Sequence, residues 1–113
     1  MIAVADSTVI LHLNKHYGKM MQTIKGYDIN TLFITRINYL EILTGSSENA
    51  KIYTRKMLQQ YPILEFDKKS VDVANTLAMK YRVSNRNSKD FLIARIAMAN
   101  KLPLLTENTR DFN

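Results

Sequence analysis

The order of apolar runs and helical patterns constrains the fold of this chain most. Residues 2–5, 31–35 and 102–106 are short, largely apolar runs of the kind that form strands, and residues 63–66 alternate as a strand does. Segments with apolar residues at helical spacing lie between them, after residue 8, over about 38–44 and 48–61, from 67 or 70 to 81, and from about 89 onward. Strands that alternate with helices, and that are apolar runs more than ribbons with one polar face, predict a parallel sheet covered by helices on both faces. We therefore expect an α/β fold.

The length and composition are those of a single domain. The 113 residues suffice for one hydrophobic core, so residues 1–113 are interpreted as one domain. There is no cysteine, so nothing requires an oxidising compartment. Residues 1–5 lack a basic segment and their apolar run ends at Asp6, which argues against a signal peptide and a membrane span. A cytoplasmic protein without membrane association is expected.

The chain is basic, with a formal net charge of +6. Such an excess attracts polyanions such as RNA or DNA and speeds their encounter. Many basic proteins bind no nucleic acid, because net charge also favours solubility. Charge by itself therefore leaves both interpretations open.

Four carboxylates stand at positions that matter in a parallel sheet, where functional sites lie beyond the carboxyl ends of the strands. Asp6 follows the first apolar run, Glu41 lies in an apolar helix after the second, and Asp111 follows the last. Asp90 is in the first turn of the most apolar helix. Each has an ordinary explanation when taken alone, as a helix cap, a surface glutamate, a charge on the helix dipole or part of a terminal turn. Their joint placement predicts one cluster.

A cluster of carboxylates at neutral pH requires a neutralising cation, because like charges raise one another's pKa. The nearby donors are oxygens, with Thr106 and Asn108 beside Asp111, and no cysteine or histidine is close in the pattern. Oxygen ligands favour Mg²⁺ or Mn²⁺ over Zn²⁺. Ser7 is interpreted as a capping or ligand-supporting hydroxyl, and His12 and His16 receive no role.

The sequence resembles the PIN domains, most closely the VapC-type toxins of bacterial and archaeal toxin–antitoxin pairs. Four segments carry the resemblance, which covers the whole chain: VADSTVI at 4–10, LEILTG at 40–45, KDFLIA at 89–94 and LLTENTRDF at 104–112. The last segment is the most specific, since a strand followed by Thr-x-Asn-x-x-Asp-Phe after an Asp-x-Leu-Ile-Ala helix is rare by chance.

The resemblance implies a three-layer α/β/α sandwich with a mostly parallel central sheet. It implies a Mg²⁺- or Mn²⁺-dependent endoribonuclease that cuts single-stranded or structured RNA such as tRNA, with Asp6, Glu41 and Asp90 as catalytic residues. The same three acids and Asp111 are the implied metal ligands, and Thr106 and Asn108 the supporting residues. It also implies a homodimer and a cognate antitoxin. The candidates for RNA phosphate contacts are Arg82, Arg86, Lys89 and Arg95, with Lys15 and Lys19 as further candidates.

The sequence departs from the family in two places. Arg95 stands where relatives usually have a small residue. The chain is also C-terminally short, because relatives usually continue through another strand, so Asp111 is the least secure of the four ligands.

Two other functions are weighed against this one. A phosphorylatable signalling receiver needs two adjacent early acids, whereas Asp6 is followed by Ser7 and Glu41 lies in a predicted helix. A catalytically inactive PIN-like module that binds nucleic acid or docks a partner remains the main alternative, because the shortened end affects Asp111.

Overall fold

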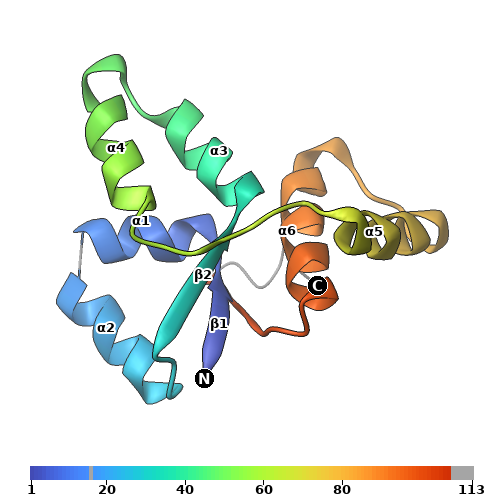
Figure 1. The fold of residues 1–113 in the computed structure, drawn as a ribbon, viewed down its shortest axis with the longest axis horizontal. Helices are drawn as coiled ribbons and strands as arrows, with labels where there is room; N and C mark the ends of the chain where they lie inside the picture. Colours follow the sequence, from blue (N-terminus) through green and yellow to red (C-terminus); the bar gives the residue numbers. More distant parts are fainter. Residues whose placement is uncertain (16, 108–113) are drawn as a thin grey trace.

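The computed structural model describes residues 1–15 and 17–107, and its elements alternate between strands and helices (Figure 1). Asn108 and Asp111 lie outside the described residues. In chain order the elements are β1 (Ile2–Ala5), α1 (Ser7–Lys15), α2 (Tyr17–Gly26), β2 (Thr31–Thr35), α3 (Arg36–Gly45), the 3-10 helix η1 (Glu48–Ala50), α4 (Lys51–Leu58), β3 (Ile63–Leu64), α5 (Lys68–Lys80), η2 (Asn85–Asn87), α6 (Ser88–Ala99) and β4 (Leu104–Leu105).

The strands form one sheet of four parallel strands in the order β3-β2-β1-β4, which confirms the predicted α/β class and parallel sheet. The central strand β1 pairs with β2 from Ile2 against Thr31, and with β4 from Val4 against Leu104. The backbone N–H of Asp6 then donates to the carbonyl of Leu105 at 2.9 Å. The residue that follows β1 is therefore held by the residue that ends β4.

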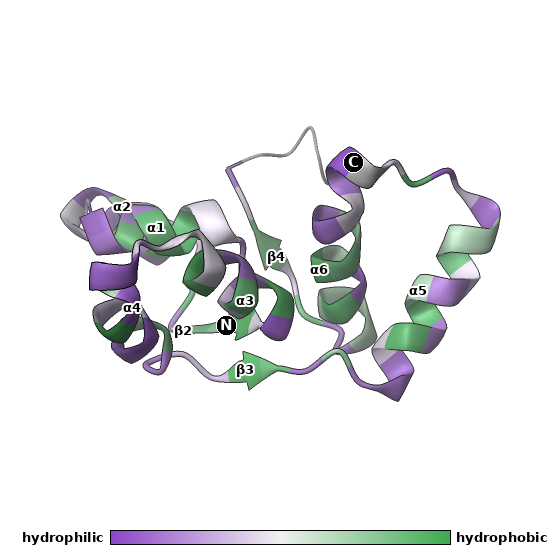
Figure 2. Ribbon diagram, turned by 90° about the horizontal axis from the view of Figure 1, so that it is seen from above, coloured by the Kyte–Doolittle hydropathy of each residue, from purple (hydrophilic) through white to green (hydrophobic). Residues whose placement is uncertain are grey.

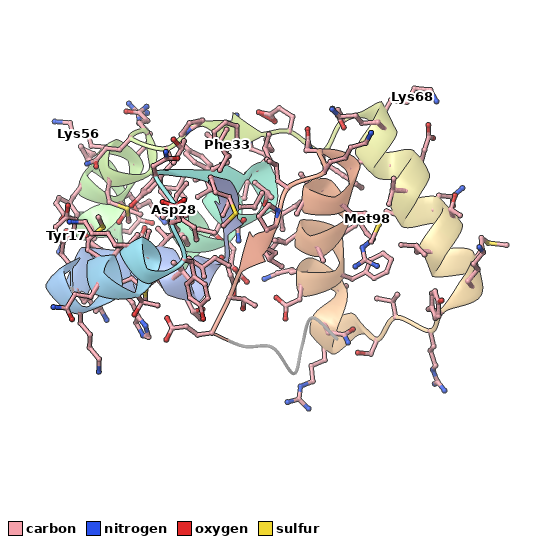
Figure 3. All side chains as sticks on the ribbon, turned by 90° about the horizontal axis from the view of Figure 1, so that it is seen from below. Tyr17, Asp28, Phe33, Lys56, Lys68 and Met98 are labelled. Atoms are coloured by element: carbon pink, nitrogen blue, oxygen red, sulfur yellow. The ribbon has the colours of Figure 1, made fainter. Side chains whose placement is uncertain are left out.

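Helices cover both faces of the sheet, as the sandwich requires (Figures 1 and 2). Because side chains alternate along a strand, Ala3 and Ala5 join the core formed with α1, α2, α3 and α4, whereas Val4 points to the opposite face. The buried residues Ile93 and Ile96 of α6 lie on that second side, and α5 packs against α6. Tyr17 and Lys56 lie at one end of the molecule and Lys68 of α5 at the other (Figure 3).

Helix starts follow capping side chains more closely than apolar periodicity. The second helix was expected from about residue 38, but α3 begins at Arg36 because Thr35 caps it: the Asn38 backbone N–H donates to Thr35 Oγ1 at 3.1 Å. At α5, Asp67 Oδ1 accepts from the Ser70 backbone and hydroxyl, and these bonds lower the pKa of Asp67.

The remaining differences from expectation concern lengths. The helix expected over about 48–61 is η1 followed by α4, which ends at Leu58. The strand expected over 63–66 is limited to Ile63–Leu64, because its partner β2 ends at Thr35, the residue that pairs with Leu64. Glu65, the next residue, forms a bidentate pair with Arg36, which holds the pKa of Glu65 below its usual value. The segment Tyr17–Gly26, to which the apolar pattern assigned no separate helix, forms α2. Within the described residues, no helix is both long and apolar enough to cross a membrane.

Candidate active site

Asp6 lies at the carboxyl end of the central strand and is almost fully enclosed, with 5% of its surface exposed. Three donors surround its carboxylate. The backbone N–H of Ser7 donates to Oδ1 at 2.6 Å, and the hydroxyls of Thr106 and Thr8 donate to Oδ2 at 2.8 and 3.2 Å. These bonds compensate part of the cost of burying a charge, so Asp6 is a preorganised carboxylate.

Ser7 links Asp6 to Glu41. While its backbone N–H donates to Asp6, its hydroxyl donates to Glu41 Oε1 at 2.5 Å. Glu41 comes from α3, the helix that begins beyond the carboxyl end of β2 (Figure 1). Its side chain is one-third exposed, so one carboxylate oxygen is bound inside while the group remains open to solvent. The predicted pair of acids is therefore brought together around a serine that acts as a support.

The start of α6 lies on the other side of Glu41. Lys89 places its Nζ 3.8 Å from Glu41 Oε2. Asp90, the next residue, is half-buried in the first turn of α6 and has polar contacts of its own. The cation of Lys89 partly neutralises Glu41 in the metal-free protein. One residue predicted to contact RNA is thus held against one of the predicted ligands.

The complete carboxylate cluster expected from the sequence is not seen in the described part of the chain. Within residues 1–15 and 17–107, no group of three or more acidic, histidine or cysteine side chains gathers closely enough to hold a metal ion. The structure does bring Thr106 onto Asp6. The fourth predicted ligand, Asp111, and the predicted supporting residue Asn108 lie outside the described residues.

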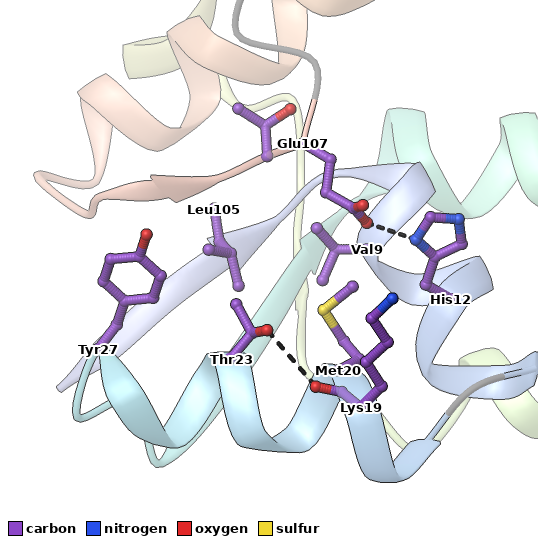
Figure 4. A pocket seen from close by; sticks show the side chains of 9 residues that line it. Val9, His12, Lys19, Met20, Thr23, Tyr27, Leu105 and Glu107 are labelled. Atoms are coloured by element: carbon purple, nitrogen blue, oxygen red, sulfur yellow. Dashed lines mark hydrogen bonds and ion pairs between the residues drawn. The ribbon is translucent and has the colours of Figure 1, made fainter.

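A cavity of about 540 Å³ adjoins this site between α1, α2 and the end of β4 (Figure 4). His12 lies on its wall and pairs with Glu107, with 2.6 Å between Nδ1 and Oε1. Thr106, which donates to Asp6, lines the same cavity. The sequence assigned His12 no role, and the structure shows it tethering the residue after Thr106 to α1.

The four basic residues proposed for RNA contacts differ in environment. Arg82 and Arg86 are exposed, and Lys89 is 65% exposed despite its contact with Glu41. Arg95 is only partly exposed: its guanidinium lies 5.0 Å from the centre of the Phe91 ring. Its Nε is buried and has no hydrogen-bond partner among residues 1–15 and 17–107, and burial lowers the pKa of the guanidinium. Arg95 therefore packs on Phe91, but the desolvation cost of its buried Nε is not offset by a hydrogen bond within the described residues.

Replacing Arg95 with methionine is expected to stabilise the fold by about 1–3 kcal/mol, because a buried donor with no partner among the described residues carries about that desolvation cost. Methionine would replace the cation–π contact on Phe91 with a sulfur–aromatic contact. Urea unfolding at constant pH measures the change. The matched control is Arg82→Met, which changes an exposed arginine and should alter stability by no more than about 0.5 kcal/mol. A loss of stability in Arg95→Met would contradict this interpretation.

No model of a known protein family matches the sequence, and no curated protein matches it. Solved structures do match. A chain of a toxin–antitoxin complex from Klebsiella pneumoniae is 22% identical with a TM-score of 0.76, and the match covers 97% of this chain and 89% of that one. VapBC2 from Rickettsia felis, bound to a DNA fragment from its promoter, is 22% identical with a TM-score of 0.74, and the match covers 97% of this chain and 90% of that one. VapBC-1 from nontypeable Haemophilus influenzae is 20% identical with a TM-score of 0.75, and the match covers 99% of this chain and 90% of that one.

All three structures match the fold of this protein over nearly its whole length. The chain has the PIN-domain fold. The three-layer α/β/α arrangement expected from the resemblance is thereby confirmed, and β1 and α3 of the PIN fold supply Asp6 and Glu41. At about 20% identity the likeness shows the fold alone, so the chemistry of the PIN-fold site rests on the residues present.

Sequence reasoning missed two buried polar residues behind the acids, Thr35 and Asn38, both 0% exposed. Asn38 Nδ2 donates to Ser7 Oγ at 2.9 Å. A signal was present, because Thr-x-x-Asn after a strand follows the spacing of a capping box, with asparagine in place of the usual glutamate or glutamine. Applied at residue 35, that pattern predicts the true start of α3.

Proposed function

We propose that this protein is a metal-dependent endoribonuclease, the toxin of a type II toxin–antitoxin pair. Its reaction is hydrolysis of phosphodiester bonds in single-stranded or structured RNA such as tRNA. The observation that carries the proposal is the pairing of Asp6 and Glu41 through Ser7 at the carboxyl end of the central strand. The carboxyl ends of parallel strands are the edge of the sheet where an active site is expected.

The donors present fit a hard divalent cation. Asp6 and Glu41 offer carboxylate oxygens that keep lone pairs beyond their hydrogen bonds, and hydroxyls are the nearest neighbours. Asp6, Glu41, Asp90 and Asp111 would hold Mg²⁺ or Mn²⁺, with Thr106 and Asn108 in support. The bound ion would supply the positive charge that activates water and stabilises the charge developing on the phosphate.

The chain's own groups then have separate tasks. Ser7 and Thr106 keep Asp6 in one orientation, so little reorganisation is needed when substrate arrives. One carboxylate, Glu41 or Asp90, orients or deprotonates the attacking water. Arg82, Arg86, Lys89 and Arg95 bind the RNA backbone, where phosphate contacts set affinity without reading sequence.

The proposed partners follow from the same assignment. The structural neighbours include a toxin–antitoxin complex and two VapBC proteins, which supports a cognate antitoxin as the protein partner of this chain. We further propose a homodimer in the cytoplasm. No membrane association is part of the proposal.

The alternative is a catalytically inactive PIN-like module that binds nucleic acid or docks a partner. One observation favours it: in the described part of the chain, the acids form no group of three close enough to hold an ion. The two functions differ in their response to metal, because binding to RNA phosphates by basic residues alone needs no divalent cation.

A magnesium titration tests the proposal. Cleavage of a total tRNA substrate by the full chain is expected to be absent in EDTA, to rise with Mg²⁺ and to saturate, as followed on denaturing gels. RNA affinity is measured in the same buffers at constant ionic strength. RNA binding that ignores Mg²⁺, together with no cleavage at any concentration, would establish the inactive module instead.

A further inference from the structure

A chain of hydrogen bonds, buried except for the last, which is partly buried, runs from the end of β2 to the candidate acids. It consists of Thr35, Asn38, Ser7 and Glu41, and the first two side chains are 0% exposed. These residues come from β2, α3 and α1, so the chain of bonds joins three elements. Each of the four side chains forms a hydrogen bond with the next, and a satisfied polar network of this kind keeps the positions of its side chains fixed.

The direction of these bonds is determined at Asn38. The backbone N–H and the hydroxyl of Thr35 both lie within hydrogen-bond distance of Asn38 Oδ1, at 3.0 and 2.7 Å. Because a backbone N–H can only donate, the atom facing it must be the amide oxygen of Asn38. The Nδ2 group is thereby turned toward Ser7 Oγ, at 2.9 Å.

The Ser7 hydroxyl accepts the hydrogen bond from Asn38 and donates a second one to Glu41. A serine hydroxyl has a single proton, and since Oγ accepts from Asn38, this proton is directed to Glu41 Oε1 at 2.5 Å. The backbone N–H of Ser7 holds Asp6 at the same time. The position of Ser7 therefore determines how far apart the two carboxylates lie.

The contact with Ser7 is more than helix capping requires. A second copy of the capping motif occurs in this chain, where Asn87 Oδ1 accepts from the backbone and hydroxyl of Ser84 at 3.2 and 2.9 Å. Capping uses only the amide oxygen in both copies. The donation by Nδ2 to an active-site serine is a feature of Asn38 that its capping role does not explain.

We infer that Asn38 is a positioning residue of the active site: it orients the Ser7 hydroxyl and thereby sets the spacing of Asp6 and Glu41 as metal ligands. This inference rests on the proposed function. Asn38 itself contacts neither of the two carboxylates through its amide nitrogen in the bonds described, so it acts through Ser7. Partners of this kind, one layer behind the ligands, typically change metal affinity by about 10–100-fold when removed.

The test measures Mn²⁺ affinity of the full chain by calorimetry for wild type, Asn38→Ala, Ser7→Ala and the double variant. We expect each single variant to weaken Mn²⁺ binding by about 10–100-fold, and the double variant to be no weaker than Ser7→Ala within about threefold. Asp67→Ala, the control, removes the side-chain cap of α5, a helix that carries none of the proposed ligands, and should leave Mn²⁺ affinity within about threefold of wild type. Denaturant curves establish that each variant is folded.

A second measurement requires no metal and keeps the inference testable if Asn38→Ala fails to fold. The side-chain amide protons of Asn38 in the wild type should exchange slowly in NMR, and Ser7→Ala, which leaves the Thr35 cap intact, should speed their exchange. With RNA as substrate, Ser7→Ala and Asn38→Ala should lower kcat while leaving KM unchanged, because neither change is placed at an RNA contact.

The outcomes separate the inference from the function. Normal Mn²⁺ affinity in Asn38→Ala, or single effects that multiply in the double variant, would overturn the role of Asn38 while leaving the nuclease intact. A wild-type chain that neither binds Mn²⁺ nor cuts RNA would instead remove the proposed function, and the role of Asn38 as a positioner of metal ligands with it.

Discussion

Asp6→Asn is expected to reduce Mg²⁺-dependent RNA cleavage by at least about 100-fold, since removal of a partner one layer further from the metal already costs about 10–100-fold. Asparagine has the shape of aspartate but no charge. Its amide nitrogen would also face one of the donors that now bind the carboxylate, either the Ser7 backbone N–H or the hydroxyls of Thr8 and Thr106. Both the attraction for a cation and the local hydrogen bonding are lost.

The measurement is the initial cleavage rate at saturating Mg²⁺, with Asp6→Asn purified in parallel with the wild type. Asp72→Asn is the matched control, because Asp72 is exposed on α5 and pairs only with Lys68 among its described contacts. Its rate should equal that of the wild type. Equal rates for Asp6→Asn and the wild type would show that the activity belongs to a contaminating nuclease or to another site.

Leu58→Ala is expected to have the largest effect on stability, about 2–5 kcal/mol. Leu58 is 0% exposed at the end of α4 and belongs to the core shared by α1, α2 and the sheet. Truncation removes buried methyl groups and leaves a cavity that the neighbouring helices fill only in part. Since small domains unfold at a cost of only about 5–15 kcal/mol, this loss is a large share of the total stability and should lower the urea midpoint clearly.

Urea unfolding followed by circular dichroism measures this change. Ile52→Ala, on the same helix but 74% exposed, should stay within about 0.5 kcal/mol of wild type. Similar losses at both positions would mean that α4 does not pack as described. An unchanged midpoint for Leu58→Ala would place this helix outside the core.

The sheet was predictable because its strands are buried on both faces. The runs that form β1 and β2 carry no charged side chain and no polar one except the threonines at the two ends of β2, and their predicted limits, 2–5 and 31–35, are those observed. β3 and β4 were expected to be longer. Each ends opposite the last residue of the strand it pairs with: Leu64 of β3 lies opposite Thr35 of β2, and Leu105 of β4 opposite Ala5 of β1. Such pairing is not visible in hydropathy.

The site was predictable only for residues with chemistry of their own. Asp6 and Glu41 were found because carboxylates in apolar surroundings need an explanation. Asn38 received no role from the sequence, and the contact of Lys89 with Glu41 was not predicted, because both contacts depend on how α1, α3 and α6 meet. Contacts between these helices arise from tertiary packing, which the spacing of neighbouring residues in a single sequence does not predict.

The bond from the Thr106 hydroxyl to Asp6 joins residues that are 100 positions apart in the chain. β1 and Asp6 are synthesised before β4, so the edge of β1 that pairs with β4 stays uncovered until β4 has been made. Asp6 therefore acquires its full set of donors only when the last described strand is in place. A nascent chain cannot display the finished site, so synthesis itself delays its assembly until most of the domain exists.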